Sequence, residues 1–136
     1  MKTIIVPVDF SPVSDNAVNY AIGLAREAHC SLLLFHAYQI PVSMTDTPTV
    51  LVSVDDMQKN ADARIGELKK QVEQKAGADM KIYAEAKLGN TVDELEDLCR
   101  QIKPFAVVMG TKGESAVERV LFGSTTLTAI RQLTWP

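Results

Sequence analysis

The fourth apolar run of the chain leads directly into a glycine loop, and together they read Phe105-Ala106-Val107-Val108-Met109-Gly110-Thr111-Lys112-Gly113. After nine further residues the chain reads Gly123-Ser124-Thr125, and apolar residues then recur at helical spacing. The apolar run has the length of a buried strand, and the later spacing predicts a helix. A strand, a glycine loop and a helix in this order are typical of an α/β fold.

This arrangement is suited to binding an anion. Glycines let the backbone approach a ligand closely, and successive N–H groups of such a loop can form a concave set of donors. The N-terminus of the following helix favours phosphate. Ser124 and Thr125 add hydroxyl donors, and Lys112 adds a positive charge that can reach phosphate oxygens. The alternative interpretation is that these glycines serve only turns and helix caps.

The rest of the chain alternates between the same two periodicities. The predicted strands cover residues 3–8, 31–38 and 81–87, and the predicted helices cover residues 12–29, 57–77 and 92–102. Ser11 before Pro12 is a good helix start, and Thr91 with Glu94 forms a capping box for the third helix. Such alternation predicts an α/β doubly wound parallel sheet, flavodoxin/Rossmann-like, which binds ligands outside the carboxyl ends of its strands.

Length, charge and cysteine use narrow the class of protein. The 136 residues suit one domain spanning 1–136, and the net charge of −3 argues against nucleic acid as a partner. No apolar run approaches the roughly 18 residues that a membrane-spanning helix needs, so no membrane partner is expected. Cys30 and Cys99 lie far apart. Two free, buried thiols in a reducing cytoplasm are therefore expected.

Three stretches of the chain resemble the universal stress protein family. They are Val6-Pro7-Val8-Asp9-Phe10-Ser11, His36-Ala37, and residues 107–113 with Gly123-Ser124. The G-x2-G-x9-G-S spacing of the last stretch matches the family's nucleotide-binding signature, and the likeness covers essentially the whole chain in order. The resemblance implies a strand order of 3-2-1-4, binding of ATP, and a role as a stress-response or regulatory module.

Position by position, the resemblance implies a site for an adenine nucleotide. Asp9 and the backbone of Ala37 would face the adenine, and Mg²⁺ would be the usual companion of ATP. The alternative for Asp9 is a loop carboxylate that caps the following helix, and the two roles are compatible because a carboxylate has two oxygens. The other implied residues are Pro7 and Val8 in the adenine pocket, Met109 and Gly110 beside the ribose, and Gly113, Gly123, Ser124 and Thr125 at the phosphates.

The resemblance also implies a fifth strand, which would begin at Pro136, where this sequence stops. We therefore expect either a shortened chain or one half of a tandem protein, with the fifth strand absent. The fourth strand would then present an unpaired edge, which is a template for another strand. We expect another chain or the stretch around Trp135 to cover it, in a homodimer or by pairing with a second domain.

Neither a catalytic residue set nor a resident metal site is predicted. His29 and His36 lack the partners of a hydrolytic triad and the spacing of metal ligands, and His36 is interpreted as a packed strand histidine. Hydrolysis of ATP is expected to be weak at most. A slow ATP hydrolase of the nucleotide α-hydrolase kind and a dimerisation module that binds no nucleotide remain as alternatives.

Overall fold

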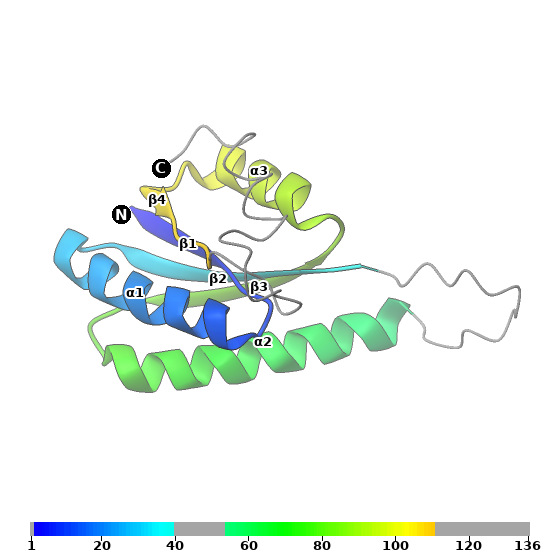
Figure 1. Ribbon diagram of the computed structural model, residues 1–136, viewed down its shortest axis with the longest axis horizontal. Helices are drawn as coiled ribbons and strands as arrows, with labels where there is room; N and C mark the ends of the chain where they lie inside the picture. Colours follow the sequence, from blue (N-terminus) through cyan, green and yellow to red (C-terminus); the bar gives the residue numbers. More distant parts are fainter. Residues whose placement is uncertain (1, 40–53, 111–136) are drawn as a thin grey trace, which may run out of the picture.

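A computed structural model describes residues 2–39 and 54–110 of the chain. The strands form one parallel sheet of order β3-β2-β1-β4. Helices α1 and α2 lie on one face of this sheet and α3 on the other (Figure 1). The α/β class and the strand order 3-2-1-4 are therefore confirmed. The elements are β1 (Thr3–Pro7), α1 (Pro12–Ala28), β2 (Ser31–Tyr38), α2 (Val54–Ala76), β3 (Ile82–Leu88), α3 (Thr91–Ile102) and β4 (Ala106–Val107).

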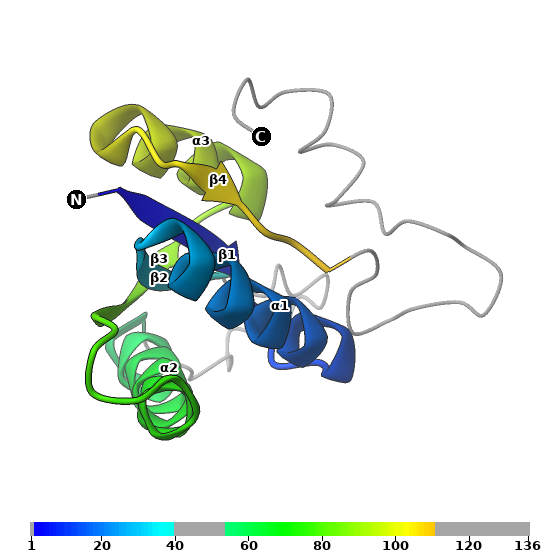
Figure 2. The ribbon, with the colours of Figure 1, turned by 90° about the vertical axis from the view of Figure 1, so that its left-hand side faces the viewer.

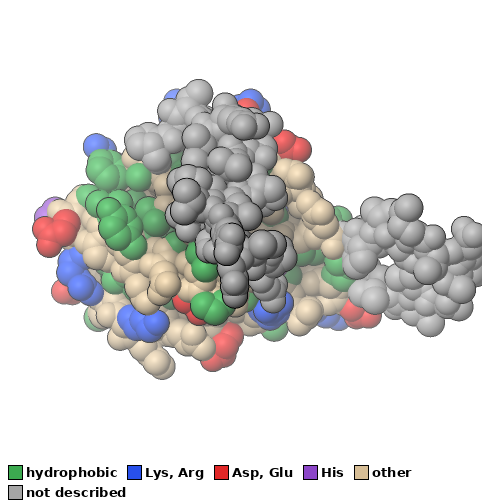
Figure 3. Space-filling model, in the orientation of Figure 1, with side chains coloured by type: hydrophobic (Ala, Val, Ile, Leu, Met, Phe, Trp, Pro, Cys, Tyr) green, Lys and Arg blue, Asp and Glu red, His purple; other side chains and the backbone are tan. Residues whose placement is uncertain are grey.

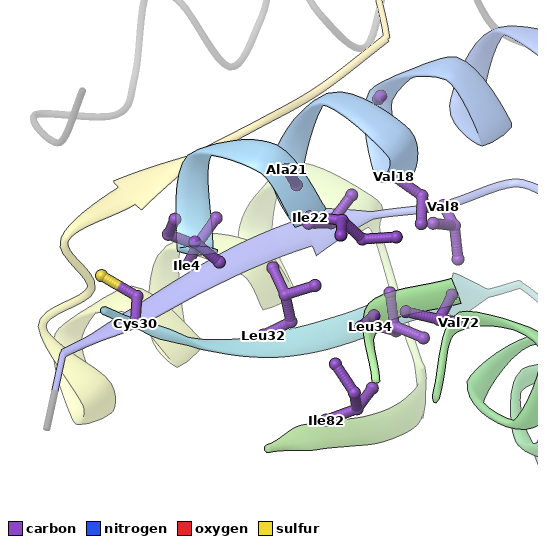
Figure 4. Packing of buried hydrophobic residues seen from close by; sticks show 14 of the residues in the cluster. Ile4, Val8, Val18, Ala21, Ile22, Cys30, Leu32, Leu34, Val72 and Ile82 are labelled. Carbon is purple, nitrogen blue, oxygen red and sulfur yellow. The ribbon is translucent and has the colours of Figure 1, made fainter. Parts of the chain in front are cut away.

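The two central strands, β1 and β2, separate two hydrophobic cores. Alternate side chains of a strand point to opposite faces, so continuous apolar runs such as these are buried on both sides. On the α1 and α2 face, Ile4, Leu32 and Leu34 are completely buried and pack with residues of both helices (Figure 4). On the α3 face, Ile5 and Phe35 are completely buried and belong to the core that includes residues of α3.

Both ends of α1 follow from local chemistry, and the sequence predicted that of the start. Ser11 is the N-cap, and its Oγ accepts the backbone N–H of Ser14 at 3.1 Å. Pro12 occupies the first turn, where its missing N–H costs little. The helix ends at His29, which adopts the left-handed conformation with φ of 56°.

The start of α3 differs from the prediction by one residue. Asn90, rather than Thr91, is the N-cap, and its side-chain oxygen accepts the N–H groups of Val92 and Asp93 at 3.0 and 3.2 Å. The expected capping box between Thr91 and Glu94 is therefore wrong. Asparagine is at least as good a cap as threonine, so the chain begins the helix one residue earlier.

The fourth strand is shorter and more exposed than predicted. It was expected over residues 105–109, but β4 covers Ala106–Val107 and, within the described part of the chain, pairs with Ile4 and Ile5 of β1. Phe105 is 38% exposed. Figure 2 shows β4 beside β1, at the edge of the described sheet. An edge strand packs against a neighbour on one side only, which explains the exposure.

The other edge of the described sheet is β3, in agreement with the strand order 3-2-1-4 that the resemblance implied. Ile82 is buried, whereas the next residue, Tyr83, is 50% exposed. Among the helices that the structure describes, none combines the length and the hydropathy that crossing a membrane requires.

Candidate functional site

The site is positioned by the parallel direction of the strands, which brings their carboxyl ends to one edge of the sheet. Past the end of β1, the N–H of Val8 donates to the carbonyl of Phe35 at 2.8 Å. Past the end of β4, the N–H of Val108 donates to the carbonyl of Ile5 at 3.0 Å. These bonds hold the chain on either side of β1 in register, so the segments that follow β1 and β4 leave the sheet close together.

The turn between β1 and α1 carries Asp9. Its Oδ1 accepts the N–H of Ser11 at 3.0 Å, and Ser11 is itself the N-cap of α1. The carboxylate therefore braces the turn that starts the helix. This observation supports a structural role close to the capping role considered from the sequence, and it also places a negatively charged group at the carboxyl edge.

The backbone of Ala37 lies where β2 extends past β1. The register of β1 with β2 ends at Pro7 and Phe35, whereas β2 continues beside β3 to its own end. The carbonyl of Phe35 points to the β1 side, where it accepts from Val8. Successive residues of a parallel strand direct their backbone groups alternately to the two neighbours. Ala37 therefore directs its N–H and C=O to the β1 side, beyond the last β1 pairing.

The chain after β4 passes very close to the first turn of α1. A Cβ built on Gly110 would lie 2.7 Å from Cγ1 of Val13 and 3.2 Å from its carbonyl oxygen. Only glycine fits such an approach without a shift of the neighbour. Gly110 therefore has a packing role at this position, in addition to the ligand contact that the resemblance implies.

The remaining predicted residues of this edge divide between the two cores. Val8 is 6% exposed and packs on the α1 and α2 side, as Figure 4 shows, so its side chain belongs to the core. Ala37 and Met109 are half-buried and pack against the α3-side core. Pro7 is buried at the end of β1.

Three residues near Asp9 that the sequence analysis did not connect meet in one cluster. The Nδ1 of His36 lies 2.9 Å from the carbonyl oxygen of Val8 and must donate to it, because a carbonyl can only accept. The ring of His36 contacts that of Phe10 with centroids 4.6 Å apart. The guanidinium of Arg64, on α2, lies 4.2 Å from the centroid of the Phe10 ring. His36 is thus a packed strand histidine, and nothing local to Arg64 in the sequence signalled the contact.

The phosphate-binding part of the predicted site lies outside the described residues. It comprises Lys112, Gly113, Gly123, Ser124 and Thr125. Within residues 2–39 and 54–110, no group of three or more histidine, cysteine, aspartate or glutamate side chains could hold a metal ion.

The two cysteines lie in the cores, away from this edge. Both Cys30 and Cys99 are free and buried. Burial, together with the smaller effect of the nearby charge of Glu96, raises the pKa of the Cys99 thiol from 9.0 to about 11. A neutral, buried thiol is a poor nucleophile, so Cys99 serves packing.

The solved structures most useful for comparison share this fold over nearly the whole chain. They are UspA from Lactobacillus plantarum (TM-score 0.82, 22% identity, 98% of this chain and 93% of that one), a universal stress protein in complex with cAMP (TM-score 0.71, 22%, 98% and 92%), and the universal stress protein from Archaeoglobus fulgidus in complex with dAMP (TM-score 0.71, 17%, 100% and 94%).

The sequence comparisons agree with the structural ones. A universal stress protein of Methanocaldococcus jannaschii is 26% identical over 125 residues, which cover 90% of this chain and 72% of the relative. The model of the universal stress protein family matches residues 1–136. Because that match spans every residue of the sequence, the chain belongs to the universal stress protein family.

Proposed function

We propose that the protein binds an adenine nucleotide, ATP, at the carboxyl edge of its sheet and acts as a stress-response regulatory module. The observation that carries this proposal is the position of Ala37, whose backbone N–H and C=O point past the last pairing of β1 with β2. Two structural relatives support it, because they are universal stress proteins in complex with cAMP and with dAMP.

The base fits the polar groups of this edge. Adenine presents an amino donor beside a ring-nitrogen acceptor, whereas guanine presents a carbonyl acceptor and an N–H donor on the equivalent atoms. The C=O and N–H of Ala37 form the complementary pair for adenine. The carboxylate of Asp9 only accepts hydrogen bonds when ionised, so it suits the adenine amino group and opposes the guanine carbonyl.

The sugar and phosphates would continue along the end of β4. We propose that Met109 and Gly110 lie beside the ribose and that Lys112, Gly113, Gly123, Ser124 and Thr125 hold the phosphates. Mg²⁺ would be carried mainly by the phosphates, because Mg²⁺ keeps several waters and is usually held through one or two carboxylates and substrate oxygens.

We also propose that the protein acts as a dimer in a reducing cytoplasm. Two free, buried cysteines suit a reducing compartment. The dimer is expected through the edge of β4.

The first test is the nucleotide content of the purified protein, released by heat and separated by chromatography. We expect ATP or ADP in the wild type and neither in a Gly123→Val variant, because a side chain there would block the approach of the phosphates. A Gly66→Val variant is the control, since Gly66 lies on α2 with open space around it.

Titration calorimetry then measures the base preference. We expect ATP to bind at least about tenfold more tightly than GTP. With GTP the site would lose one hydrogen bond, and the guanine carbonyl would face the carboxylate of Asp9. A wild type that is purified empty, and whose melting temperature does not move in excess Mg-ATP, would contradict the proposal. The same chromatography measures ADP formation, which would reveal a slow hydrolase.

A further inference from the structure

The residue after Asp9 holds a backbone conformation that its side chain disfavours. Phe10 has φ of +64°, in the left-handed region, where the Cβ comes too close to the following carbonyl oxygen. Glycine would adopt this conformation freely. A strained backbone persists only where its surroundings determine it, and such positions cluster at functional sites. We therefore looked for the contacts that hold Phe10 in this conformation.

Those contacts come from two other elements. The ring of His36, on β2, contacts the Phe10 ring at a centroid distance of 4.6 Å and an interplanar angle of 56°. The guanidinium of Arg64, on α2, lies 4.2 Å from the Phe10 centroid, within the range of a cation–π contact. Phe10 also packs against the α1 and α2 core. We call Arg64, Phe10 and His36 the aromatic clamp.

His36 is tied to the same turn a second time. Its Nδ1–H donates to the carbonyl of Val8, at 2.9 Å. The clamp therefore contacts the turn on both sides of Asp9. It contacts the backbone carbonyl of Val8 and the ring of Phe10. A change of Phe10 to negative φ would move its ring relative to His36 and Arg64, so the clamp is suited to holding the turn that carries Asp9.

The outer side of the clamp faces an open groove. Phe10 and Arg64 line a groove of about 400 Å³ between the start of α1 and α2. The acidic side chains of Asp15 and Glu67 line the same groove. Arg64 is exposed on α2, so solvent reaches the guanidinium, and the contact belongs to the weaker range of cation–π interactions.

We propose that Arg64 and His36 are positioning residues for the base site. They act on the nucleotide through Phe10 and Asp9 and do not touch it themselves. This inference rests on the proposed binding of an adenine nucleotide at the same edge. It predicts that a cation on α2, remote in sequence from every strand end, controls both the affinity for ATP and the preference for ATP over GTP.

The test compares Arg64→Ala with the conservative Arg64→Lys, and with Lys70→Ala as a control on an exposed position of the same helix. For Arg64→Ala we expect the Kd of ATP to rise about two- to fivefold, as a solvent-exposed cation–π contact supplies, and the ATP over GTP preference to narrow. Arg64→Lys should restore most of the affinity, because an ammonium also binds an aromatic face. Lys70→Ala should match the wild type.

A double-mutant cycle separates positioning from a general effect on the helix. Phe10→Gly removes the ring and accepts the same backbone conformation. If Arg64 acts through Phe10, adding Arg64→Ala to Phe10→Gly should change neither the Kd of ATP nor the Kd of GTP any further. Additive losses, or an Arg64→Ala variant that binds ATP and GTP like the wild type, would overturn the proposal.

A spectroscopic readout in the absence of nucleotide distinguishes failure of the clamp from failure of nucleotide binding. The N–H of Ser11 donates to Asp9 Oδ1, so its amide NMR signal reports the orientation of the carboxylate. We expect this signal to move in Arg64→Ala and to return in Arg64→Lys. If the wild type binds no nucleotide but the signal moves, the proposed function fails while the clamp stands. If the signal does not move, the clamp is rejected.

Discussion

At the scale of single residues, Asp9 has an observed structural role, and we propose that it also contacts the base. One of its oxygens accepts the N–H of Ser11 at 3.0 Å and so braces the start of α1. A carboxylate has two oxygens and can accept more than one hydrogen bond, so bracing the turn is compatible with the proposed contact with the base. A substitution at Asp9 that preserves the turn would therefore test the proposed binding role separately.

Asp9→Asn is such a substitution, because the amide oxygen can still accept from Ser11. We expect the melting temperature to stay near that of the wild type, while the affinity for ATP falls about 10-fold with the loss of a charge-assisted bond. The preference over GTP should narrow, since the amide NH₂ can donate to the guanine carbonyl. Calorimetry with both nucleotides provides the measurement, and an unchanged ATP to GTP ratio would contradict the assignment of Asp9 to the base.

Cys99 provides a prediction that is independent of any ligand. Its folded-state pKa of about 11 lies above the ordinary value of 9.0, so the unfolded chain loses the thiol proton first as the pH rises. The contribution to stability is therefore complete below pH 9 and is lost between pH 9 and 11, by up to about 2 kcal/mol. Urea unfolding across this range should show a steeper loss for the wild type than for Cys99→Ala, and parallel curves would contradict it.

At the scale of elements, Gly110 and Gly66 differ in the space that a side chain would find. Gly110→Ala would place a Cβ 2.7 Å from Val13 Cγ1, and we expect a loss of about 1–3 kcal/mol from overpacking between β4 and α1. Gly66, inside α2, has nothing within 4 Å of a built Cβ. Gly66→Ala should therefore stabilise the protein by about 1 kcal/mol through helix propensity. Chemical denaturation of both variants tests the opposite signs.

The start of α3 offers a second test at this scale. Asn90 holds two N–H groups of the first turn, so Asn90→Ala should cost about 1 kcal/mol. Thr91 is the first helical residue rather than the cap, so Thr91→Ala should change the stability much less. Equal losses of stability in the two variants, measured by urea unfolding, would instead support the capping box between Thr91 and Glu94.

At the scale of the whole molecule, the β4 edge is the expected contact between chains. On the face shown in Figure 3, hydrophobic side chains gather over the region where Figure 1 places β4 and the adjoining part of α1. Phe105, at the start of this edge, is 38% exposed, with the ammonium of Lys2 5.2 Å from its ring centroid. Among residues 2–39 and 54–110, β4 pairs with β1 alone. An edge strand can add a strand of another chain, which supports the prediction of a homodimer.

Sedimentation velocity on edge variants tests this prediction. We expect Phe105→Glu to shift the protein toward the monomer, because a charge at a strand edge discourages pairing. Tyr83→Glu places the same change on β3, the opposite edge of the described sheet, where Tyr83 is 50% exposed, and it should leave the oligomeric state unchanged. A wild-type monomer whose β4 edge is ordered and open to solvent would refute the idea.

The sequence alone determined the features that depend on neighbours along the chain. Periodicity separated strands from helices, whereas the strand order 3-2-1-4 was implied by the resemblance to a known family. Ser11 and Pro12 marked the start of α1 for the same local reason. The cap of α3 was missed because Asn90 and Thr91 are both good cap residues, and local preference differs too little between them.

Only the tertiary structure decided what surrounds the candidate site. Ala37 lies beyond the last pairing of β2 with β1 because β2 is the longer strand, and the close approach of Gly110 to Val13 results from the path of the chain after β4. The aromatic clamp joins Arg64, Phe10 and His36 from three separate elements. No local pattern encodes these contacts, because they depend on which strand ends first and which helix face packs above it.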